Sequence, residues 1–348
     1  MKKLIPMLMI ALLLCSGCNL VEKAPALNRY EGSFLDVFDT VTKVVLYDTD
    51  QESAAKRVEA IHQELVQYHR LFDIYNSYDG LNNLYTVNQN AGVAPVKVDA
   101  RLLELIHFSK EMYALTGGKT NIALGSVLKI WHDYREAGIE DPEHAALPPM
   151  EALEAAAALT DINDVIVDEE AGTLYLAKPG MSLDVGAIAK GYAAQMAVDS
   201  MRADGVTSLL LSVGGNVCGI GMRADGQDWK VSVQSPDMQG SLCMVHVNDQ
   251  SLVTSGTYQR YYTVGGVRYH HIIDPATLMP AAYYESVSVL CPDSGLADAL
   301  STALFIMPLE DGLALISTLE GTEALWVDAQ GNQTMSDGFA GYIIEESD

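Results

Sequence analysis

Positive charge is scarce in this chain. Lys and Arg together number 21 against 46 Asp and Glu, which leaves a net charge of −25 over 348 residues. A chain this acidic has no broad basic face for phosphates, so nucleic-acid binding is excluded, as is adhesion to anionic lipid by charge alone. A phosphate-bearing ligand would have to be held locally, by backbone N–H groups, a metal ion or a few cations.

Cysteine is scarce as well, with five in the whole chain. Cys15 and Cys18 lie in the N-terminal leader, whereas Cys218, Cys243 and Cys291 are far apart and form no CxxC or Cys/His pattern. These spacings exclude a metal site built on cysteine. Since three thiols cannot all pair, we expect buried core residues, and one disulfide among them stays an open alternative.

The longest apolar run is too short to span a bilayer. Residues 4–14 follow Lys2 and Lys3 and fit the core of a signal peptide. The run ends in Leu14-Cys15-Ser16-Gly17-Cys18, which resembles a bacterial lipobox. We expect residues 1–17 to be a lipoprotein signal peptide, Cys18 to be lipidated, and residues 18–29 to tether a domain over residues 30–348. The protein would then be lipid-anchored at the extracytoplasmic face of the cell membrane; the alternative is a secreted protein cleaved nearby.

Helix and strand patterns come in clusters rather than in strict alternation, which indicates an α+β fold. Residues 30–48 are rich in strand formers, residues 51–72 and 100–116 have helical apolar spacing, and residues 136–148 are predicted to be a loop. The glycine-rich stretch 214–221 lacks G-x-G-x-x-G spacing and leads into a strand pattern, which excludes a Rossmann fold. Further strands are predicted at residues 165–176 (a hairpin), 229–234, 244–247, 251–255 and 286–290.

Residues 269–280 contain two histidines, one carboxylate and two prolines. Pro275 favours an extended conformation for Asp274, and His271 lies three residues before that carboxylate. An imidazole near a rigid carboxylate is what a site needs to activate a hydroxyl. From these residues alone, a hairpin whose histidines only satisfy backbone groups is an equally good interpretation.

Two further stretches are candidate anion sites. Asp184 precedes a predicted helix whose first turns are rich in small residues and contain Lys190. A helix N-terminus of this kind binds anions, although Asp184 would also serve as a plain N-cap. The polar turn Thr254-Ser255-Gly256 offers hydroxyl and N–H groups to a phosphate, or is an ordinary hairpin turn.

Asp298 and Thr302 are four residues apart in a helix predicted over residues 294–307, with Ser294 as its N-cap. This spacing places both side chains on one helix face. A carboxylate and a hydroxyl on one face suit Mg²⁺, which takes oxygen ligands and keeps positions for water or phosphate. Alternatively, Thr302 bonds to its own helix and Asp298 complements the helix dipole.

Taken in order, these stretches resemble the bacterial FAD:protein FMN transferases, the ApbE family. The resemblance covers residues 30–345, and its most specific part is Tyr-x-His-Ile-Ile-Asp-Pro at 269–275 together with Ala-Asp-Ala-Leu-Ser-Thr at 297–302. The matching motifs are Phe38-Asp39-Thr40 and residues 121–131, 183–192, 211–221, 254–258, 269–280 and 297–303.

The resemblance implies a T-fold-like α+β body of two lobes, with antiparallel sheets packed by helices and FAD in the cleft between the lobes. It implies Mg²⁺ bound by the Ala187 backbone oxygen, the Asp298 carboxylate and the Thr302 hydroxyl. His271 matches the proposed base, with Asp274 as its orienter or as an alternative base. The FAD contacts, besides residues 254–256, are Phe38, Tyr75 or Tyr78, Gly118, Lys119, Thr120, Asp184, Lys190 and Ile272.

The sequence departs from the family pattern at two places. Leu278 follows Thr277 where the family often has glycine, and Thr120-Asn121 stands where a Phe-Asp pair is common. Both departures concern the shape of the flavin pocket rather than the chemistry.

The activity that the resemblance implies is Mg²⁺-dependent transfer of FMN from FAD to a threonine or serine hydroxyl of exported redox flavoproteins, with release of AMP. One alternative is a Mg²⁺-dependent FAD pyrophosphatase, in which water replaces the hydroxyl; another is a flavin-binding lipoprotein without catalysis. Intact Asp298, Thr302 and His271 favour the enzymes, because a binding protein needs no base. The expected partners are FAD, an exported acceptor protein and, through the lipid anchor, the membrane.

Overall fold

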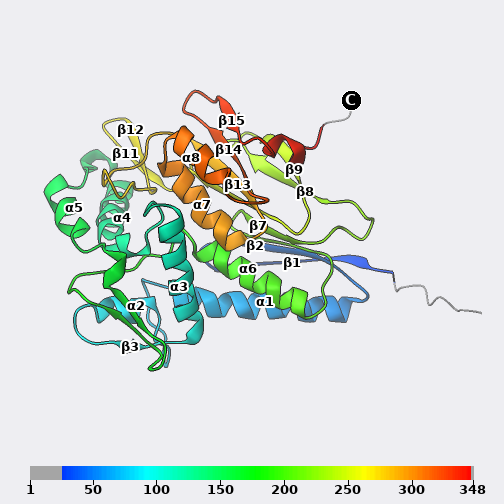
Figure 1. Ribbon diagram of the computed structural model, residues 1–348, viewed down its shortest axis with the longest axis horizontal. Helices are drawn as coiled ribbons and strands as arrows, with labels where there is room; N and C mark the ends of the chain where they lie inside the picture. The colour runs from blue at the N-terminus through cyan, green and yellow to red at the C-terminus, as the bar shows by residue number, and fades with distance from the viewer. Residues whose placement is uncertain (1–25, 346–348) are drawn as a thin grey trace, which may run out of the picture.

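An eight-stranded antiparallel sheet forms the centre of the computed structural model, which describes residues 26–345 (Figure 1). The predicted signal peptide, Cys18 and the first part of the tether lie outside the described residues. All neighbouring strands of this sheet are antiparallel. In spatial order they are β1 (Asn28–Val37), β2 (Thr40–Asp48), β6 (Leu209–Val213), β7 (Asn216–Ile220), β10 (Ser251–Gly256), β13 (Ser286–Cys291), β14 (Glu323–Val327) and β15 (Gln333–Met335).

Three smaller sheets surround the large one, and all their pairings are antiparallel too. The α+β class with antiparallel sheets and packing helices is thereby confirmed. The small sheets contain β3 (Val96–Lys97), β5 (Thr173–Leu176) and β4 (Val165–Asp168); β11 (Tyr261–Val264) and β12 (Val267–His270); and β8 (Trp229–Gln234) and β9 (Ser241–Val247).

The two faces of the central sheet are covered by different elements, because successive side chains of a strand point to opposite sides. On one face, Val253, Val287 and Trp326 pack with helix α7 (Ser294–Ile306) in a shared core cluster. On the other face, their neighbours Leu252 and Leu290 pack with the β8–β9 hairpin. The sheet is therefore buried between a helical layer and a small second sheet.

The helical layer is built mainly from α7, α6 (Ala189–Ala203), α1 (Gln51–Phe72) and α3 (Ala100–Leu115), which lie together in Figure 1. Helix α1 has the predicted bounds: Asp50 caps it by accepting from the Ser53 N–H at 2.9 Å, and Ile61 and Leu65 are fully buried. The remaining helices are α2 (Leu84–Gln89), α4 (Gly125–Glu140), α5 (Met150–Ala157) and α8 (Leu309–Ile316). Within the described residues, none of the helices is both long and apolar enough to cross a membrane.

Several local predictions were wrong. Helix α4 continues to Glu140, through residues predicted to be a loop. Gly138 within this segment allows close packing: a Cβ there would lie 2.6 Å from Cδ2 of Tyr262. Helix α7 is capped by Asp293 rather than Ser294, because the Asp293 carboxylate accepts from the Leu296 N–H at 2.7 Å.

The three cysteines of the described chain are free thiols, so the open disulfide alternative is not realised. Cys218 and Cys291 are buried as expected, whereas Cys243 is only partly buried. Burial raises the pKa of Cys218 to about 12, so this thiol stays protonated and inert at neutral pH.

Candidate active site

A cavity of about 510 Å³ opens where the helical layer, the ends of the central strands and the loop after β12 meet. Its wall includes residues of three separate core clusters, such as Phe72, Trp131 and Ile272. Its size is within the range usual for cofactor-sized ligands. The predicted site residues that line it are Phe38, Tyr75, Lys119, Thr120, Asp184, Ala187, Lys190, Thr254, Ser255, Gly256, His271, Ile272, Asp298 and Thr302.

Three predicted site residues do not line the cavity. The Tyr78 hydroxyl donates to Asp73 at 2.8 Å, which leaves Tyr75 as the tyrosine that faces the cavity. Gly118 follows helix α3 with φ +83°, and its N–H donates to the Tyr113 carbonyl at 2.8 Å, so its role is to end that helix. Asp274 is buried and forms an ion pair with Lys119 at 3.2 Å.

Helices α6 and α7 approach each other very closely beneath the cavity. A Cβ on Gly191 would lie 2.2 Å from the Ser294 carbonyl oxygen and 2.5 Å from Cβ of Asp298. Only glycine fits there, and its exposed N–H donates to Oδ2 of Asp298 at 2.8 Å. Gly191 therefore lets helix α7 approach helix α6 closely, and this contact fixes the Asp298 carboxylate.

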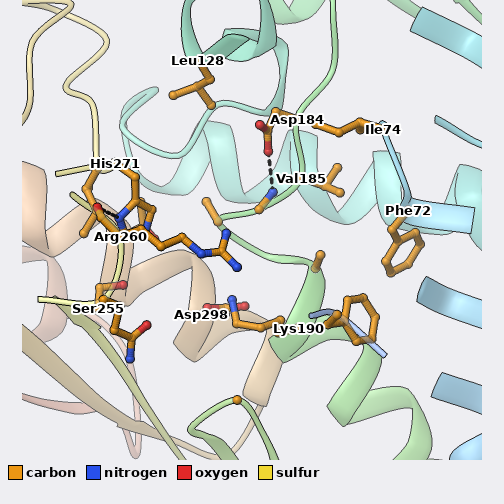
Figure 2. Close-up of a pocket in the computed structure, with 18 of the residues that line it drawn as sticks. Phe72, Ile74, Leu128, Asp184, Val185, Lys190, Ser255, Arg260, His271 and Asp298 are labelled. Carbon is orange, nitrogen blue, oxygen red and sulfur yellow. Dashed lines mark hydrogen bonds between the residues drawn. The ribbon is translucent and has the colours of Figure 1, made fainter. Parts of the chain in front are cut away.

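Burial raises the pKa of Asp298, while Lys190, the Gly191 N–H and the Asn216 amide partly oppose this rise. Figure 2 shows the Lys190 ammonium next to the Asp298 carboxylate. Asn216 is also buried, and its Nδ2 makes no hydrogen bond of normal geometry with a described residue. The buried Asn216 amide therefore lacks the partner that such a group normally has, next to a carboxylate whose charge is only partly offset.

The donor set in this corner fits a hard divalent cation. Asp298 and Thr302 lie one helical turn apart on α7, and both line the cavity together with Ala187. In the described part of the chain the Thr302 hydroxyl forms no hydrogen bond, whereas Ser301 next to it donates to its own helix at the Asp298 carbonyl. A carboxylate, a hydroxyl and a backbone carbonyl are oxygen ligands that Mg²⁺ accepts, with the remaining positions left for water or phosphate.

Asp184 occupies a tight turn rather than a helix cap. Helix α6 starts later, after Ile188, which makes no side-chain cap. The Asp184 carboxylate accepts from the Gly186 N–H at 2.8 Å, and this bond is drawn in Figure 2. Burial raises the pKa of Asp184, and Arg260 is the largest opposing charge. The N-cap interpretation was wrong, and the carboxylate shapes the loop that carries Ala187.

His271 is held by a backbone carbonyl rather than by the predicted carboxylate. Its N–H and its Nδ1 both contact the Arg260 carbonyl oxygen, at 3.1 Å and 3.2 Å. Since a carbonyl only accepts, Nδ1 carries the proton and Nε2 is left as the acceptor. Asp274, predicted to orient His271, is bound to Lys119 instead. In the structure the Arg260 carbonyl, rather than Asp274, holds the His271 ring.

His271 is neutral at physiological pH. Burial, followed by the positive charge of Arg260 and the neighbouring His270, lowers the pKa of His271 to about 3. A neutral imidazole with a free Nε2 accepts a proton from a nearby hydroxyl. The ring lines the same cavity as Asp298 and Lys190, and Figure 2 shows these side chains arranged around one space.

The β1–β2 turn forms one edge of the cavity. Phe38 and Asp39 connect the paired residues Val37 and Thr40, and both adopt left-handed conformations, with φ of 53° and 51°. Such a two-residue turn matches the twist of the strands, but it costs roughly 1 kcal/mol or more per non-glycine residue. The Phe38 N–H donates to Nδ1 of His69 at 3.2 Å, which helps to hold this strained turn at the cavity.

Sequence reasoning missed much of the cavity wall. These residues come from separate turns, helices and strands that are far apart in the sequence. Three of them had a usable signal: Asp39 and Asn216 lie within the matched stretches 38–40 and 211–221, and Arg260 lies two residues after the matched stretch 254–258. The main polar residues missed are Asp39, His69, Asn76, His132, Arg135, Asn216, Gln259 and Arg260.

Fold and site together define an α+β protein with a cavity for an anionic, cofactor-sized ligand. A sequence model described as the ApbE family matches residues 38–326. The FAD:protein FMN transferase of Treponema pallidum is 37% identical over 260 residues, covering 70% of each chain. That of Escherichia coli K12 is 26% identical over 349 residues and covers 97% of each chain. The chain therefore belongs to the ApbE family, as the sequence motifs predicted.

Solved structures agree with this assignment. The crystal structure of the ApbE protein from Thermotoga maritima matches with a TM-score of 0.80 and 27% identity, over 91% of this chain and 100% of that chain. The flavin transferase ApbE from Vibrio cholerae matches with a TM-score of 0.75 over 91% of this chain; at 22% identity it supports the fold alone.

Proposed function

We propose that this protein transfers FMN from FAD to a hydroxyl of an acceptor protein and releases AMP. The observation that carries the proposal is the shared cavity: a neutral imidazole, a lysine and an oxygen-donor corner face one space. The names of the curated relatives, FAD:protein FMN transferase, support the same reaction. The threonine or serine nature of the acceptor, and its export, are further parts of the proposal that come from the family resemblance.

In the proposed reaction His271 acts as the general base. The acceptor hydroxyl oxygen attacks the phosphorus of the FMN half of FAD, and its proton moves to Nε2 of His271. The bond between that phosphorus and the bridging oxygen breaks, and its electron pair leaves with AMP. Because Nδ1 is fixed on the Arg260 carbonyl at 3.2 Å, the free Nε2 keeps one orientation throughout.

Lys190 and the oxygen-donor corner serve the phosphates. Lys190 lines the cavity beside Asp298 and places positive charge where negative charge develops in the transition state. Ala187, Asp298 and Thr302 would hold Mg²⁺, which neutralises pyrophosphate charge when bound. In a chain of net charge −25, local cations of this kind are needed to hold an anionic substrate.

We also propose that the protein works as a lipoprotein. The basic, apolar and small-residue segments at residues 1–17 support a signal peptide, and Cys18 supports a lipid anchor. The enzyme would then act at the extracytoplasmic face of the membrane, on exported acceptors. Labelling cells with a radioactive fatty acid tests this: the wild-type chain should become labelled, and a Cys18→Ala chain should not.

Covalent transfer is tested directly on a gel. The protein is mixed with FAD, Mg²⁺ and a small exported flavoprotein domain that offers an acceptor threonine, and a denaturing gel is viewed under ultraviolet light. Mg²⁺-dependent fluorescence that migrates with the acceptor supports the proposal. Free FMN and AMP without a fluorescent acceptor would favour the pyrophosphatase, and intact bound FAD would favour a binding protein.

A further inference from the structure

Arg260 places a guanidinium in the cavity without an acidic partner. The residue lies just before strand β11, and its side chain lines the cavity. Figure 2 shows it extending past His271 toward the space beside Lys190 and Asp298. Among the described residues, no carboxylate lies within ion-pair distance of Arg260 and its guanidinium forms no hydrogen bond. By contrast, Arg135 on the same cavity wall contacts Glu136 at 3.3 Å and His132 at 2.8 Å.

Arg260 differs from the other described arginines without an ion pair, because Arg70 and Arg268 pack over tyrosine rings whereas Arg260 lines the cavity. Most of the described arginines form ion pairs, such as Arg57 with Asp48 at 2.6 Å and Arg101 with Asp99 at 2.7 Å. A guanidinium presents a planar fork of donors that matches phosphate oxygens, often with two hydrogen bonds at once. The structure thus keeps a phosphate-binding group free at the place where the pyrophosphate of FAD would have to lie.

The same residue also positions the base. The Arg260 carbonyl contacts both the backbone N–H and Nδ1 of His271, at 3.1 Å and 3.2 Å. A shift of Arg260 toward a bound anion would therefore change the position of the His271 imidazole directly. The side chain of Arg260 faces the phosphate end of the cavity, and its carbonyl holds the proton acceptor, His271.

We propose that Arg260 is a catalytic residue that binds the phosphate under attack, while its carbonyl orients His271. This proposal rests on the proposed function. As the acceptor oxygen–phosphorus bond forms and the bond to the bridging oxygen breaks, negative charge builds up on the phosphate oxygens. The Arg260 guanidinium shares this charge with Lys190, and the proton still leaves on His271.

The arrangement has a consequence for the pH dependence of the reaction. The charged and titratable groups that act on His271 are Arg260, His270 and Lys190, and all of them disfavour its protonated form. Loss of the Arg260 charge should raise the pKa of His271 from about 3 toward its ordinary value. Because the base works in its neutral form, the acid limb of the rate profile should then move to higher pH.

The test compares three variants of the full chain: Arg260→Gln, Arg260→Lys and the control Arg268→Gln. Arg268 lies on the same hairpin, but it is exposed, packs over the Tyr261 ring at 5.0 Å and does not line the cavity. We measure AMP release and FMN transfer at saturating FAD from pH 4 to pH 8. Arg260→Gln should lower kcat about 100-fold and shift the acid limb upward, Arg260→Lys should recover part of the rate, and Arg268→Gln should match wild type.

FAD affinity, measured by quenching of flavin fluorescence, gives a second readout that does not need turnover. Arg260→Gln should weaken FAD binding about tenfold relative to Arg268→Gln. Equal affinity and an unmoved acid limb in Arg260→Gln would overturn the inference even if the wild-type enzyme transfers FMN. If wild type transfers nothing, the proposed function fails, and the affinity ratio alone still decides whether Arg260 binds the phosphates.

Discussion

Two parts of the cavity differ in how they are held. The reaction site (Lys190, His271, Asp298 and Thr302) is partly or fully buried. Lys190, Asp298 and Thr302 stand on the packed helices α6 and α7, and the Arg260 carbonyl holds His271. The rim (Asp39 and Tyr75) is more exposed, and Tyr75 remains 59% accessible. Beneath Asp298, the contact between α6 and α7 at Gly191 tolerates no added atom. At the rim, side chains rest on turns and strand ends.

We infer that the buried residues act in the reaction, whereas the exposed rim residues determine how the flavin and the acceptor bind. Close packing around Gly191 fixes the Asp298 carboxylate, as catalysis requires of groups that act on developing charge. The rim holds aromatic and charged side chains near solvent, where a flavin and an acceptor segment would enter. We therefore expect changes in the reaction site to abolish turnover and changes at the rim to alter affinity.

His271→Ala should have the largest effect. Loss of the base should reduce FMN transfer by about 10²–10⁴-fold, while FAD affinity stays within a few-fold of wild type. Transfer is measured by acceptor fluorescence on a gel and affinity by flavin quenching. If transfer survives the substitution, His271 is not the base, and the expected difference between reaction-site and rim substitutions is contradicted.

Asp298→Asn should have the second-largest effect. Turnover should fall by roughly 10²–10³-fold, and the response to Mg²⁺ should be lost. Stability should change in the opposite direction. Burial raises the pKa of Asp298 in the folded chain, so folding favours the protonated form. The stability of the metal-free protein is therefore greatest below the unfolded pKa and declines as pH rises through the folded pKa.

The neutral amide avoids that decline and can still accept the Gly191 N–H. Metal-free Asp298→Asn should accordingly melt at a higher temperature than wild type at pH 7, measured by circular dichroism with EDTA present. An unchanged Mg²⁺ response, or a lower melting temperature without metal, would contradict the assignment of Asp298 to a cation site.

Gly191→Ala tests the packing beneath the reaction site. The added Cβ would lie 2.2 Å from the Ser294 carbonyl oxygen, so α6 and α7 must separate, at a cost of about 1–3 kcal/mol in unfolding free energy. Gly341→Ala is the matched control, because nothing lies within 4 Å of the added carbon there. Urea unfolding checks both variants, and equal stabilities would show that the close contact is unimportant.

Tyr75→Ala should have the smallest effect. The ring lies at the rim and packs near His132, with 5.3 Å between ring centroids. Its removal should weaken FAD affinity by about tenfold or less and leave kcat nearly unchanged. Tyr78→Phe, which loses only the bond to Asp73, should bind FAD within twofold of wild type. A large loss of kcat in Tyr75→Ala would break the distinction between rim and reaction site.

The sequence predicted the features that depend on local periodicity. Helix α1 has the predicted bounds, and Asp298 and Thr302 line one cavity, because helical spacing alone places them on the same face. The partner of His271 was not predictable in this way. The competing interaction of Asp274 with Lys119 joins residues 155 positions apart, and no local pattern reports such a contact.

The departure at Leu278 has a structural explanation. Leu278 adopts the left-handed conformation that glycine favours, with φ 61°, which costs about 1–2 kcal/mol. Its side chain is buried in the cluster that contains Trp131, and the Trp131 indole N–H donates to the Leu278 carbonyl at 2.9 Å. Burial of a leucine is worth a similar amount, so the substitution is tolerated. The sequence identified the departure at Leu278, but it did not predict that burial of the side chain offsets the cost of the left-handed conformation.

The most direct test of the central claim counts products. The enzyme, FAD, Mg²⁺ and an acceptor domain are incubated, and AMP is quantified together with acceptor that carries FMN by intact-protein mass spectrometry; a Thr→Val acceptor is the control. We expect one AMP for each modified acceptor, no modified acceptor in the control, and neither product with His271→Ala. AMP without modified acceptor, or modification that survives loss of His271, would contradict it.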